Sequence, residues 1–325
     1  MKLVKPSIEN LDIATDPLKA IELAGRTCYK SEDKITVDSA ERFVKMLLKR
    51  GHHAMIEHSN FILSVDPDIY EYIRHLPVRP YIRMSCDIGG NGCLISGNPR
   101  ALRDFCLSPE VGSGIQRMIA VELSKKSLTL FEDVIRYTEH LAHLDTDALG
   151  KVDLFDNVKS LSTWERVLHD VMSYRIICDR GVTHEIVRHR PFSYAQESTR
   201  YVNYMDGVEF IIPPWIPVEP QEIVAEDTFT AEVHTTPDQD WLAAMGGAEL
   251  EYKELIDKMW TPQQARSVLP NSLKTEIVVT GNLREWRHFF KLRCDKAAHP
   301  QMREVANMIL TDIRERVPAI FDEVN

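Results

Sequence analysis

The sequence predicts an α+β protein in which helices flank a mixed or antiparallel sheet. Helix-like and strand-like runs do not alternate in the strict βαβ order that a parallel sheet requires. The chain of 325 residues is 44% hydrophobic and 27% charged, which is ordinary for a folded protein with a sizeable core. This composition excludes disorder as the main state.

The N-terminal segment predicts two helices and a strand. Apolar residues recur at near-helical spacing over 16–30, and a second helix is expected from Asp38 to Gly51. Asp38 can cap this helix, and Gly51 suits the left-handed position that follows a helix end. The run FILSV reads as a strand that ends at Asp66-Pro67.

The middle of the chain is rich in proline, glycine and asparagine. We expect 67–113 to form loops with one short strand at CLIS. Two helices should follow, at about 114–142 and 160–172.

The C-terminal half predicts strands that are followed by capped helices. Tyr174–Cys178 reads as a strand, with a turn at Asp179-Arg180-Gly181 and a short helix at 183–189. The strand TEIVVTG leads to Asn282, which can cap a helix over 283–293. The remaining expected elements are a strand in VEFIIPPWIP, a solvated acidic connection at 218–240, helices at 239–259 and from Pro300, and a capping box at Thr261-Pro262-Gln263-Gln264.

One internal similarity links distant parts of the chain. The segment ISGNPRALRDF at 95–105 resembles VTGNLREWRHF at 279–289, and each reads as a strand, Gly-Asn and then a helix. Two explanations remain open. The segments are independent examples of a common strand-to-helix junction, or they descend from an old duplication in which only one copy need keep a site.

The charge and cysteine patterns limit the class of protein. A formal charge of -10 argues against a protein that coats long nucleic acid. The six cysteines include no CxxC pair, so a reduced compartment fits best. No signal peptide and no run of about 18 apolar residues is present. We therefore expect a soluble cytoplasmic protein without a membrane or nucleic-acid partner.

Searches for common ligand motifs exclude several sites. There is no GxGxxG and no GxxxxGK[ST], so neither a Rossmann loop nor a P-loop is available. His184 and His189 are five residues apart and diverge by about 140° on a helix, so they do not form a zinc-protease pair. His140 and His143 lack a third ligand, and we expect no metal.

The densest chemistry lies in HEIVRHRPFSYAQESTRYVNY at 184–204. Its four potential cations are Arg188, His189, Arg190 and Arg200. Arginine side chains suit phosphate or carboxylate, and each sheltered charge-assisted bond contributes about 1.5–3 kcal/mol. Composition alone leaves two interpretations, a buried anion site or a charged helix end with ion pairs to Glu185 and Glu197.

RHRPFSYAQES fits the pattern RHR-x7-S, from Arg188 to Ser198, and resembles the signature of the flavin-dependent thymidylate synthases, the ThyX family. Other segments are similar to the same family: AGRTCY, GH-x4-EH ending at His58, ARSVLPNSL with Arg266, and NLREWRHFFKLR followed by AHPQMRE. Together they cover 1–66 and 171–325.

The resemblance implies an enzyme that methylates dUMP to dTMP. The carbon would come from methylenetetrahydrofolate, the hydride from reduced FAD, and the reducing power from NADPH. The family works as a homotetramer whose active sites lie where subunits meet.

The resemblance also implies roles for individual residues. The FAD site would contain His58, Arg188, His189, Arg190, Asn282 and His288. The dUMP site would contain Gln196, Ser198, Arg200, Arg266 and Arg293. Arg293 would face the pyrimidine, and Arg293, Ser198 and Arg188 are the candidate catalytic residues. Against these roles, His58 could merely make a core hydrogen bond, and Arg266 could be a surface residue of its helix.

The chemistry that the resemblance implies agrees with these residue types. A flavin hydride reaction needs orientation and electrostatics from the protein, and arginine near the uracil carbonyls would stabilise negative charge. No protein nucleophile is then required, and no Pro-Cys segment of the cysteine-dependent synthases is present. Cys28 or Cys294 as a nucleophile remains an alternative.

Three features depart from the family pattern. Many members have Asn-Glu where this chain has Ala195-Gln196, and Glu185 stands where others carry Gln. We leave Glu185 off the phosphate because its carboxylate would repel it. The largest departure is 67–170, which we treat as a mainly helical insertion between the two parts of the catalytic core.

Two rivals to this function remain. One is a flavin and folate enzyme that acts on another pyrimidine nucleotide or adds hydroxymethyl. The other is a catalytically silent nucleotide-binding or oligomer-forming relative. Arg200, Arg266 and Arg293 together weigh against the silent relative.

Overall fold

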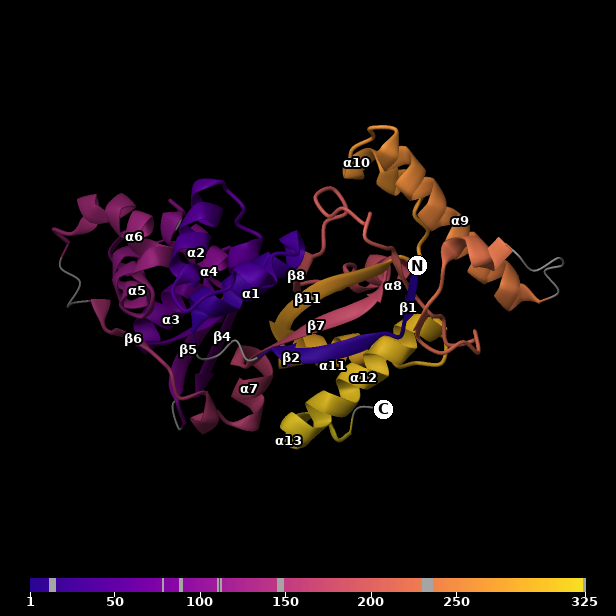
Figure 1. Cartoon of the computed structure of the whole chain (residues 1–325). Helices are drawn as coiled ribbons and strands as arrows, with labels where there is room; N and C mark the ends of the chain where they lie inside the picture. Colours follow the sequence, from indigo (N-terminus) through magenta and orange to yellow (C-terminus); the bar gives the residue numbers. More distant parts are fainter. Residues whose placement is uncertain are drawn as a thin grey trace.

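The structure is a computed structural model that describes residues 1–11, 16–77, 79–87, 90–109, 111, 113–144, 149–229 and 236–323. Three sheets lie along the molecule (Figure 1), and each is flanked by helices as the sequence predicts. The α+β class is therefore confirmed.

The central sheet contains four strands, of which β8 carries part of RHRPFSYAQES and β11 leads into NLREWRHFFKLR. Its order is β2-β7-β11-β8, and every neighbouring pair is antiparallel. The strands are β2 (Ser7–Leu11), β7 (Val171–Asp179), β11 (Lys274–Asn282) and β8 (Ser193–Gln196). The strands expected at Tyr174–Cys178 and in TEIVVTG are confirmed, and both are longer than predicted.

Alternation along β11 explains how both faces of this sheet are covered. Ile277 and Val279 point into a core with α11 (Leu283–Arg293) and α12 (Pro300–Arg316), beneath the sheet in Figure 1. Val278 packs on the opposite face against α1 (Pro17–Tyr29). Successive side chains of β11 point to opposite faces of the sheet, and both faces are covered, so the strand is buried over its whole length.

The second sheet has the order β4-β5-β3-β6, again antiparallel throughout. Its core contains Phe43 and Leu63 together with Leu102 and Phe131. Residues before position 67, where the insertion was expected to begin, therefore share one core with residues after it. The strands are β3 (Phe61–Val65), β4 (Ile82–Asp87), β5 (Gly92–Gly97) and β6 (Val152–Leu154); the helices around it are α2 (Ser39–Lys49), α3 (Pro67–Arg74), α4 (Pro99–Leu107), α5 (Ser113–Lys126), α6 (Leu128–Tyr137) and α7 (Thr163–His169).

The prediction of loops over 67–113 is wrong. Two helices and two strands occupy most of this stretch, and CLIS lies inside the longer β5. Both helices begin with proline at the first helical position, where the missing N–H costs nothing, so proline marks helix starts here. The helix expected at 114–142 is divided at Ser127, and the helix expected at 160–172 ends at His169, before β7.

The third sheet, β10-β1-β9, lies near the N-terminus and the long helix α9. The buried amino group of Met1 lies 2.7 Å from Glu249 Oε2 of α9. Its strands are β1 (Lys2–Val4), β9 (Glu209–Ile211) and β10 (Gln221–Glu222), and α9 spans Pro237–Asp257. Further helices elsewhere in the molecule are α8 (Arg180–Ile186), α10 (Pro262–Ala265) and α13 (Pro318–Phe321). Residues 230–235 of the predicted acidic connection lie outside the described residues.

Most of the predicted helix caps are present. Asn282 Oδ1 accepts from the backbone N–H of Glu285 at 3.0 Å, Thr261 N–H donates to Gln264 Oε1 at 2.9 Å, and Gly51 has φ +70°. Asp38 precedes α2 but makes no capping hydrogen bond with its side chain. The turn expected at Asp179-Arg180-Gly181 is instead the start of α8.

The cysteines are not all reduced thiols. Cys86 and Cys93 face each other on β4 and β5 and form a disulfide, contrary to the expectation of reduced cysteines. Cys28, Cys106, Cys178 and Cys294 remain thiols.

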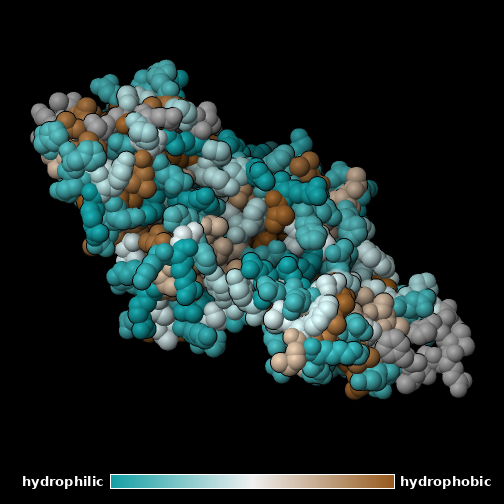
Figure 2. Space-filling view, turned by 90° about the horizontal axis from the view of Figure 1, so that it is seen from above, coloured by the Kyte–Doolittle hydropathy of each residue, from teal (hydrophilic) through white to brown (hydrophobic). Residues whose placement is uncertain are grey.

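Figure 2 shows one face of the molecule as mainly hydrophilic, with hydrophobic residues in separate small patches. Within the part of the chain that the structure describes, no helix combines the length and the apolarity needed to cross a bilayer.

Candidate functional site

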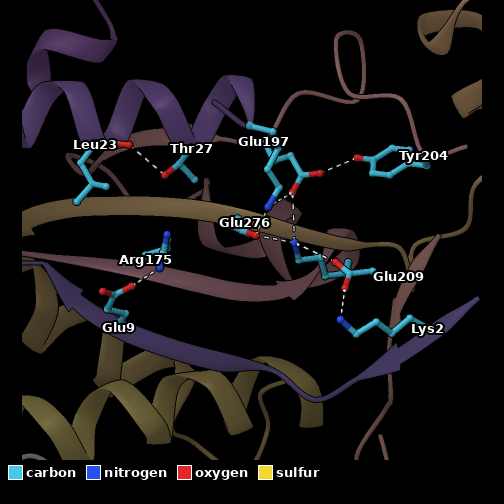
Figure 3. Close-up of polar contacts among 11 residues, drawn as sticks. Lys2, Glu9, Leu23, Thr27, Arg175, Glu197, Tyr204, Glu209 and Glu276 are labelled. Atoms are coloured by element: carbon cyan, nitrogen blue, oxygen red, sulfur yellow. Dashed lines mark hydrogen bonds and ion pairs between the residues drawn. The ribbon is translucent and has the colours of Figure 1, made fainter. Parts of the chain in front are cut away.

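A cluster of buried charges lies where the chain leaves β8 (Figure 3). Lys274 Nζ lies 2.6 Å from Glu276 Oε1 and 3.7 Å from Glu197 Oε2. Lys30, at the end of α1, pairs with both glutamates. Tyr204 donates its hydroxyl to Glu197 Oε1 at 2.7 Å. Glu197 therefore has three partners, Lys30, Lys274 and Tyr204, and its side chain is only 1% exposed.

The charges of this cluster stabilise one another. Burial favours the neutral form of Lys274, yet Glu197 and Glu276 raise its pKa above the ordinary value. Burial likewise opposes ionisation of Glu276, but Lys274 and Lys30 lower its pKa. The cluster thus keeps its ions in a site where unpaired charges would be strongly unfavourable.

The cluster fixes the turn that carries two predicted substrate residues, Ser198 and Arg200. The backbone N–H of Glu197 donates to Glu276 O at 2.8 Å, and that of Ser198 donates to Cys28 O at 3.0 Å. Arg266 Nη1 donates to Thr199 Oγ1 at 3.0 Å, which joins Arg266 to the turn. Arg200 is exposed on the same turn. The structure thus brings Ser198, Arg200 and Arg266 together around one exposed surface.

Gln196 is the last residue of β8 and precedes this turn. Its Nε2 donates to Thr183 Oγ1 at 3.0 Å and to Thr275 Oγ1 at 3.3 Å. Its amide is thus positioned by hydroxyls from two neighbouring elements.

A second group joins α8 to the end of α11. Arg293 Nη1 lies 2.6 Å from Glu185 Oε2, and Arg293 Nε donates to His189 Nε2 at 2.7 Å. Burial, Arg293 and His288 together lower the pKa of His189 to about 4, so the imidazole is neutral and accepts this bond. Among the described residues, no hydrogen bond or ion pair joins Arg293 to Ser198, Arg200 or Arg266.

Three more of the predicted flavin residues, Arg188, Arg190 and His288, lie close to His189 in the chain or in space. Arg188 and Arg190 are exposed, and Arg188 Nε donates to the carbonyl of His184 at 3.2 Å. His288 is exposed on α11, with its ring centroid 6.2 Å from that of His189.

His58 lies between the two large sheets, and its neighbours Glu57 and Ser59 line a small polar cavity there. Its Nδ1 lies 2.8 Å from Thr280 Oγ1 of β11, and its ring is completely buried. Burial lowers the pKa of His58 to about 4, and the nearby backbone of Tyr194 partly offsets this lowering. Nε2 makes no hydrogen bond with any residue that the structure describes. The neutral imidazole therefore has one nitrogen without a hydrogen-bond partner among the described residues.

The cavity has a volume of about 40 Å³ and is lined from both sheets. Asn282 and Thr280 contribute from β11, Ser193 from β8, and Tyr81 and Arg83 from the region of β4. Arg83, Leu168 and Pro191 also line a larger groove of about 600 Å³ that Arg284 borders. This volume is in the range of ordinary ligand sites.

Sequence reasoning missed Tyr81, Arg83, Ser193 and Arg284 as lining residues. Tyr81 and Arg83 lie in the stretch that was expected to be loops, so nothing in the local pattern placed them near β11. Arg284 was visible as part of NLREWRHF but carried no assigned role.

Burial disfavours thiolate chemistry near these groups. Burial and then Glu197 raise the pKa of Cys28, and burial raises the pKa of Cys294 to about 11. Within the described residues, no group of three or more His, Cys, Asp and Glu side chains is arranged to hold a metal ion.

Comparison with known proteins gives a family match over most of the chain. The model of the family described as "Thymidylate synthase complementing protein" matches residues 11–71 and 120–319. Proteins named flavin-dependent thymidylate synthase from Corynebacterium diphtheriae and from Mycobacterium sp. (strain KMS) are each 37% identical, over 150 and 147 residues. Each match covers 44% of this chain and 57% of the relative.

A similarity to a solved structure spans the whole chain. The UMP/dUMP methylase PolB from Streptomyces cacaoi, bound with 5-Br dUMP, covers 100% of both chains with 16% sequence identity and a TM-score of 0.39. From the family model, which matches well over half of its residues, we conclude that the chain belongs to the thymidylate synthase complementing protein family.

Proposed function

We propose that this protein is a flavin-dependent thymidylate synthase that converts dUMP to dTMP. Methylenetetrahydrofolate would donate the carbon, and NADPH would reduce the bound FAD. One observation carries the proposal: two sets of candidate residues lie at opposite ends of β8. Ser193, at its start, lines the polar cavity near His58, while Ser198, just beyond its end, begins the turn that contacts Arg266.

The turn supplies the nucleotide side of the proposed site. Arg200 and Arg266 present guanidinium groups that can bind a phosphate by charge-assisted hydrogen bonds. Ser198 and Gln196 would complete the dUMP contacts. The buried glutamates nearby do not repel the phosphate strongly, because Lys30 and Lys274 compensate them.

Arg293 supplies a positive charge whose direction is fixed. Glu185 holds one end of its guanidinium, and neutral His189 accepts from Nε. We assign Arg293 to the pyrimidine, where it would stabilise the negative charge that develops as the ring is activated.

The flavin side meets a test of fit that is independent of the family match. His58 Nε2 is a buried polar atom without a hydrogen-bond partner among the described residues, and Thr280, which bonds to His58 Nδ1, lines the cavity. The adjoining groove combines Arg83 and Arg284 with apolar Leu168 and Phe105. Such a lining suits an apolar ring that carries polar and phosphate groups. His58, Asn282, Arg188, His189, Arg190 and His288 would hold FAD, which supplies the hydride when bound and reduced.

No protein nucleophile is needed in this proposal. The raised pKa values of Cys28 and Cys294 keep both thiols protonated at neutral pH, which supports a role for protein groups in binding and orientation only.

We also propose a cytoplasmic homotetramer, in keeping with the resemblance. Light scattering coupled to gel filtration measures its mass directly. A mass of about four chains supports this assembly, and any other mass contradicts it.

The test of function is an assay with dUMP, methylenetetrahydrofolate, FAD and NADPH, in which mass spectrometry identifies the nucleotide product. Formation of dTMP that requires every component supports the proposal. A hydroxymethylated product, or turnover of another pyrimidine nucleotide only, indicates the rival chemistry. Tight dUMP binding without any turnover indicates a silent relative.

A further inference from the structure

The two large sheets repeat the same plan. One has the order β4-β5-β3-β6 and the other β8-β11-β7-β2, and all neighbours in both are antiparallel. In each, a strand is followed by a short helix, α3 or α8, whose N-cap residue is an aspartate, Asp66 or Asp179. We call residues 55–107 the first repeat and residues 163–293 the second repeat.

The sequence similarity noted above falls at equivalent places in these repeats. ISGNPRALRDF spans β5 and α4, and VTGNLREWRHF spans β11 and α11. Asn98 Oδ1 accepts from the N–H three residues later at 2.8 Å, as Asn282 Oδ1 does at 3.0 Å. The tripeptides Arg79-Pro80-Tyr81 and Arg190-Pro191-Phe192 also correspond, since each lies at the start of the edge strand β4 or β8.

Contacts between the repeats are reciprocal. His58 precedes β3 and bonds to Thr280 on β11 of the second repeat, while His169 precedes β7 and bonds through Nδ1 to Ser96 on β5 of the first repeat at 2.7 Å. Strands are also exchanged: β2 precedes the first repeat but pairs with β7, and β6 precedes the second repeat but pairs with β3. Independent junctions would not share strand order, caps and crossed contacts, so we favour duplication.

The two equivalent histidine positions differ in one respect. His169 uses both ring nitrogens, because Ser85 Oγ lies 2.8 Å from Nε2. His58 Nε2 has no such partner among the described residues. Its neighbours Glu57 and Ser59 and its partner Thr280 line the cavity, so the two related positions differ on the side of the cavity.

Direct contacts join the first repeat to the cavity of the second. Glu57 accepts from Ser193 Oγ at 2.9 Å, and Tyr81 donates its hydroxyl to the carbonyl of Phe192 at 3.3 Å. Asn60 lines the same cavity.

We propose that the first repeat acts as a built-in partner subunit. It supplies the face with Glu57, Asn60, Tyr81 and Arg83 to the cavity of the second repeat within the same chain, so each chain forms one flavin site without a neighbour. This replaces the view of 67–170 as a separate insertion. The flavin as ligand rests on the proposed function; the assembly within one chain rests on the contacts above.

The first test uses mixed oligomers. Chains with Asn60→Ala in the first repeat and chains with Arg190→Ala in the second carry different tags, are expressed together, and are purified through both tags. Each variant alone should bind FAD at least tenfold more weakly than the unchanged protein. If sites form within one chain, an FAD titration of the mixed species shows only the two weakened affinities. A class of sites with the original affinity would mean that neighbouring chains complete each other's sites, and would overturn the proposal.

Two further outcomes of this test are decisive. If the protein is a monomer that binds one FAD per chain, the site is complete within a chain. If Asn60→Ala leaves FAD affinity unchanged, the same mixing is done with Tyr81→Ala, and unchanged affinity in both contradicts a role for the first repeat.

A second test does not depend on flavin. Glu57→Cys and Ser193→Cys are introduced in one chain, where their side chains are in contact, and the protein is oxidised. A cross-link within the chain gives a monomer on a denaturing gel without reductant, with a tryptic peptide that joins the two positions. A covalent dimer, absent from either single variant, would overturn assembly within one chain. A protein that binds no FAD yet forms the internal cross-link refutes the proposed function alone.

Discussion

At the scale of single residues, Glu197 links the fold to the proposed nucleotide site. Its carboxylate is buried between Lys30 and Lys274 and accepts from Tyr204, while the next residue begins the turn that contacts Arg266. The side chain thus fixes the backbone of the turn without forming part of its exposed surface.

Glu197→Gln keeps the shape of this side chain but removes its charge. We expect the free energy of unfolding to fall by about 1–3 kcal/mol, because the buried ammonium group of Lys274 and the partly buried one of Lys30 lose part of their compensation. The KM for dUMP should rise more than the Kd for FAD changes. Glu219→Gln is the control, since Glu219 is 85% exposed in its pair with Lys5. Equal stability of the two variants in urea would refute this role.

The flavin and nucleotide residues should separate in binding measurements. Arg188→Ala should release FAD and leave the purified protein colourless. Arg200→Ala should weaken dUMP binding roughly 10- to 100-fold, the equivalent of one charge-assisted bond, with little change in FAD binding. Arg136→Ala on exposed α6 is the control. Equal losses of both ligands in each variant would show that the two subsites are misassigned.

Three buried histidines predict an acid-sensitive fold. Burial lowers the pKa values of His58, His169 and His189 from 6.5 to about 4, so the unfolded chain binds more protons between these values. The contribution of these three histidines to the free energy of unfolding should therefore be largest above about pH 6.5 and should decrease toward pH 4. Between the two pKa values, each histidine changes the free energy of unfolding by at most about 1.4 kcal/mol per pH unit.

Urea unfolding at pH 7, 6 and 5 measures this slope. His169→Gln should reduce this slope by the amount that one histidine contributes. Substitution of the exposed His140 should leave the slope unchanged. A slope that is flat over this range contradicts neutral buried imidazoles.

At the scale of elements, the junction of β11 with β8 depends on the absence of a side chain. A Cβ on Gly281 would lie 2.2 Å from Cδ1 of Phe192, whose ring packs 4.7 Å from that of Trp286. The strand and the ring can approach this closely only with glycine. The same contact positions Pro191 and Ser193 beside the cavity.

Gly281→Ala should lower the free energy of unfolding by about 1–3 kcal/mol, the usual cost of overpacking a filled core. Phe192→Leu in the same chain should recover part of this loss by making room. A double-mutant cycle followed by thermal unfolding measures the coupling. Additive losses would mean that the two residues do not clash.

Local sequence signals predicted the elements of the C-terminal half well. Asn282 before NLREWRHF and the capping box at Thr261 each satisfy backbone groups within a few residues, so their effect can be read locally. The same signal at Asp66-Pro67 was read only as the end of a strand, although at Asn98-Pro99 the internal similarity already indicated a helix. A proline after a capping residue marks either a helix start or a loop, and only the tertiary core decides between them.

At the scale of the whole molecule, the contacts that build the site join residues far apart in the chain. His58 and Thr280 are 222 residues apart, and Glu57 and Ser193 are 136 apart. Periodicity cannot reveal such pairs. The resemblance named His58, Asn282 and the arginines, but Tyr81 and Arg83 could be placed only once the second sheet was known. The assigned roles of the predicted residues stay predictions.

The crossed placement of β2 and β6 has a consequence for synthesis. The partner of β2 on β7 lies more than 150 residues downstream, and β11, which completes that sheet, comes later still. A nascent chain therefore leaves the ribosome with β2 unpaired until more than half of the polypeptide has been translated. Exposed strand edges are sites of aggregation, so chaperone demand during translation should be concentrated in this interval.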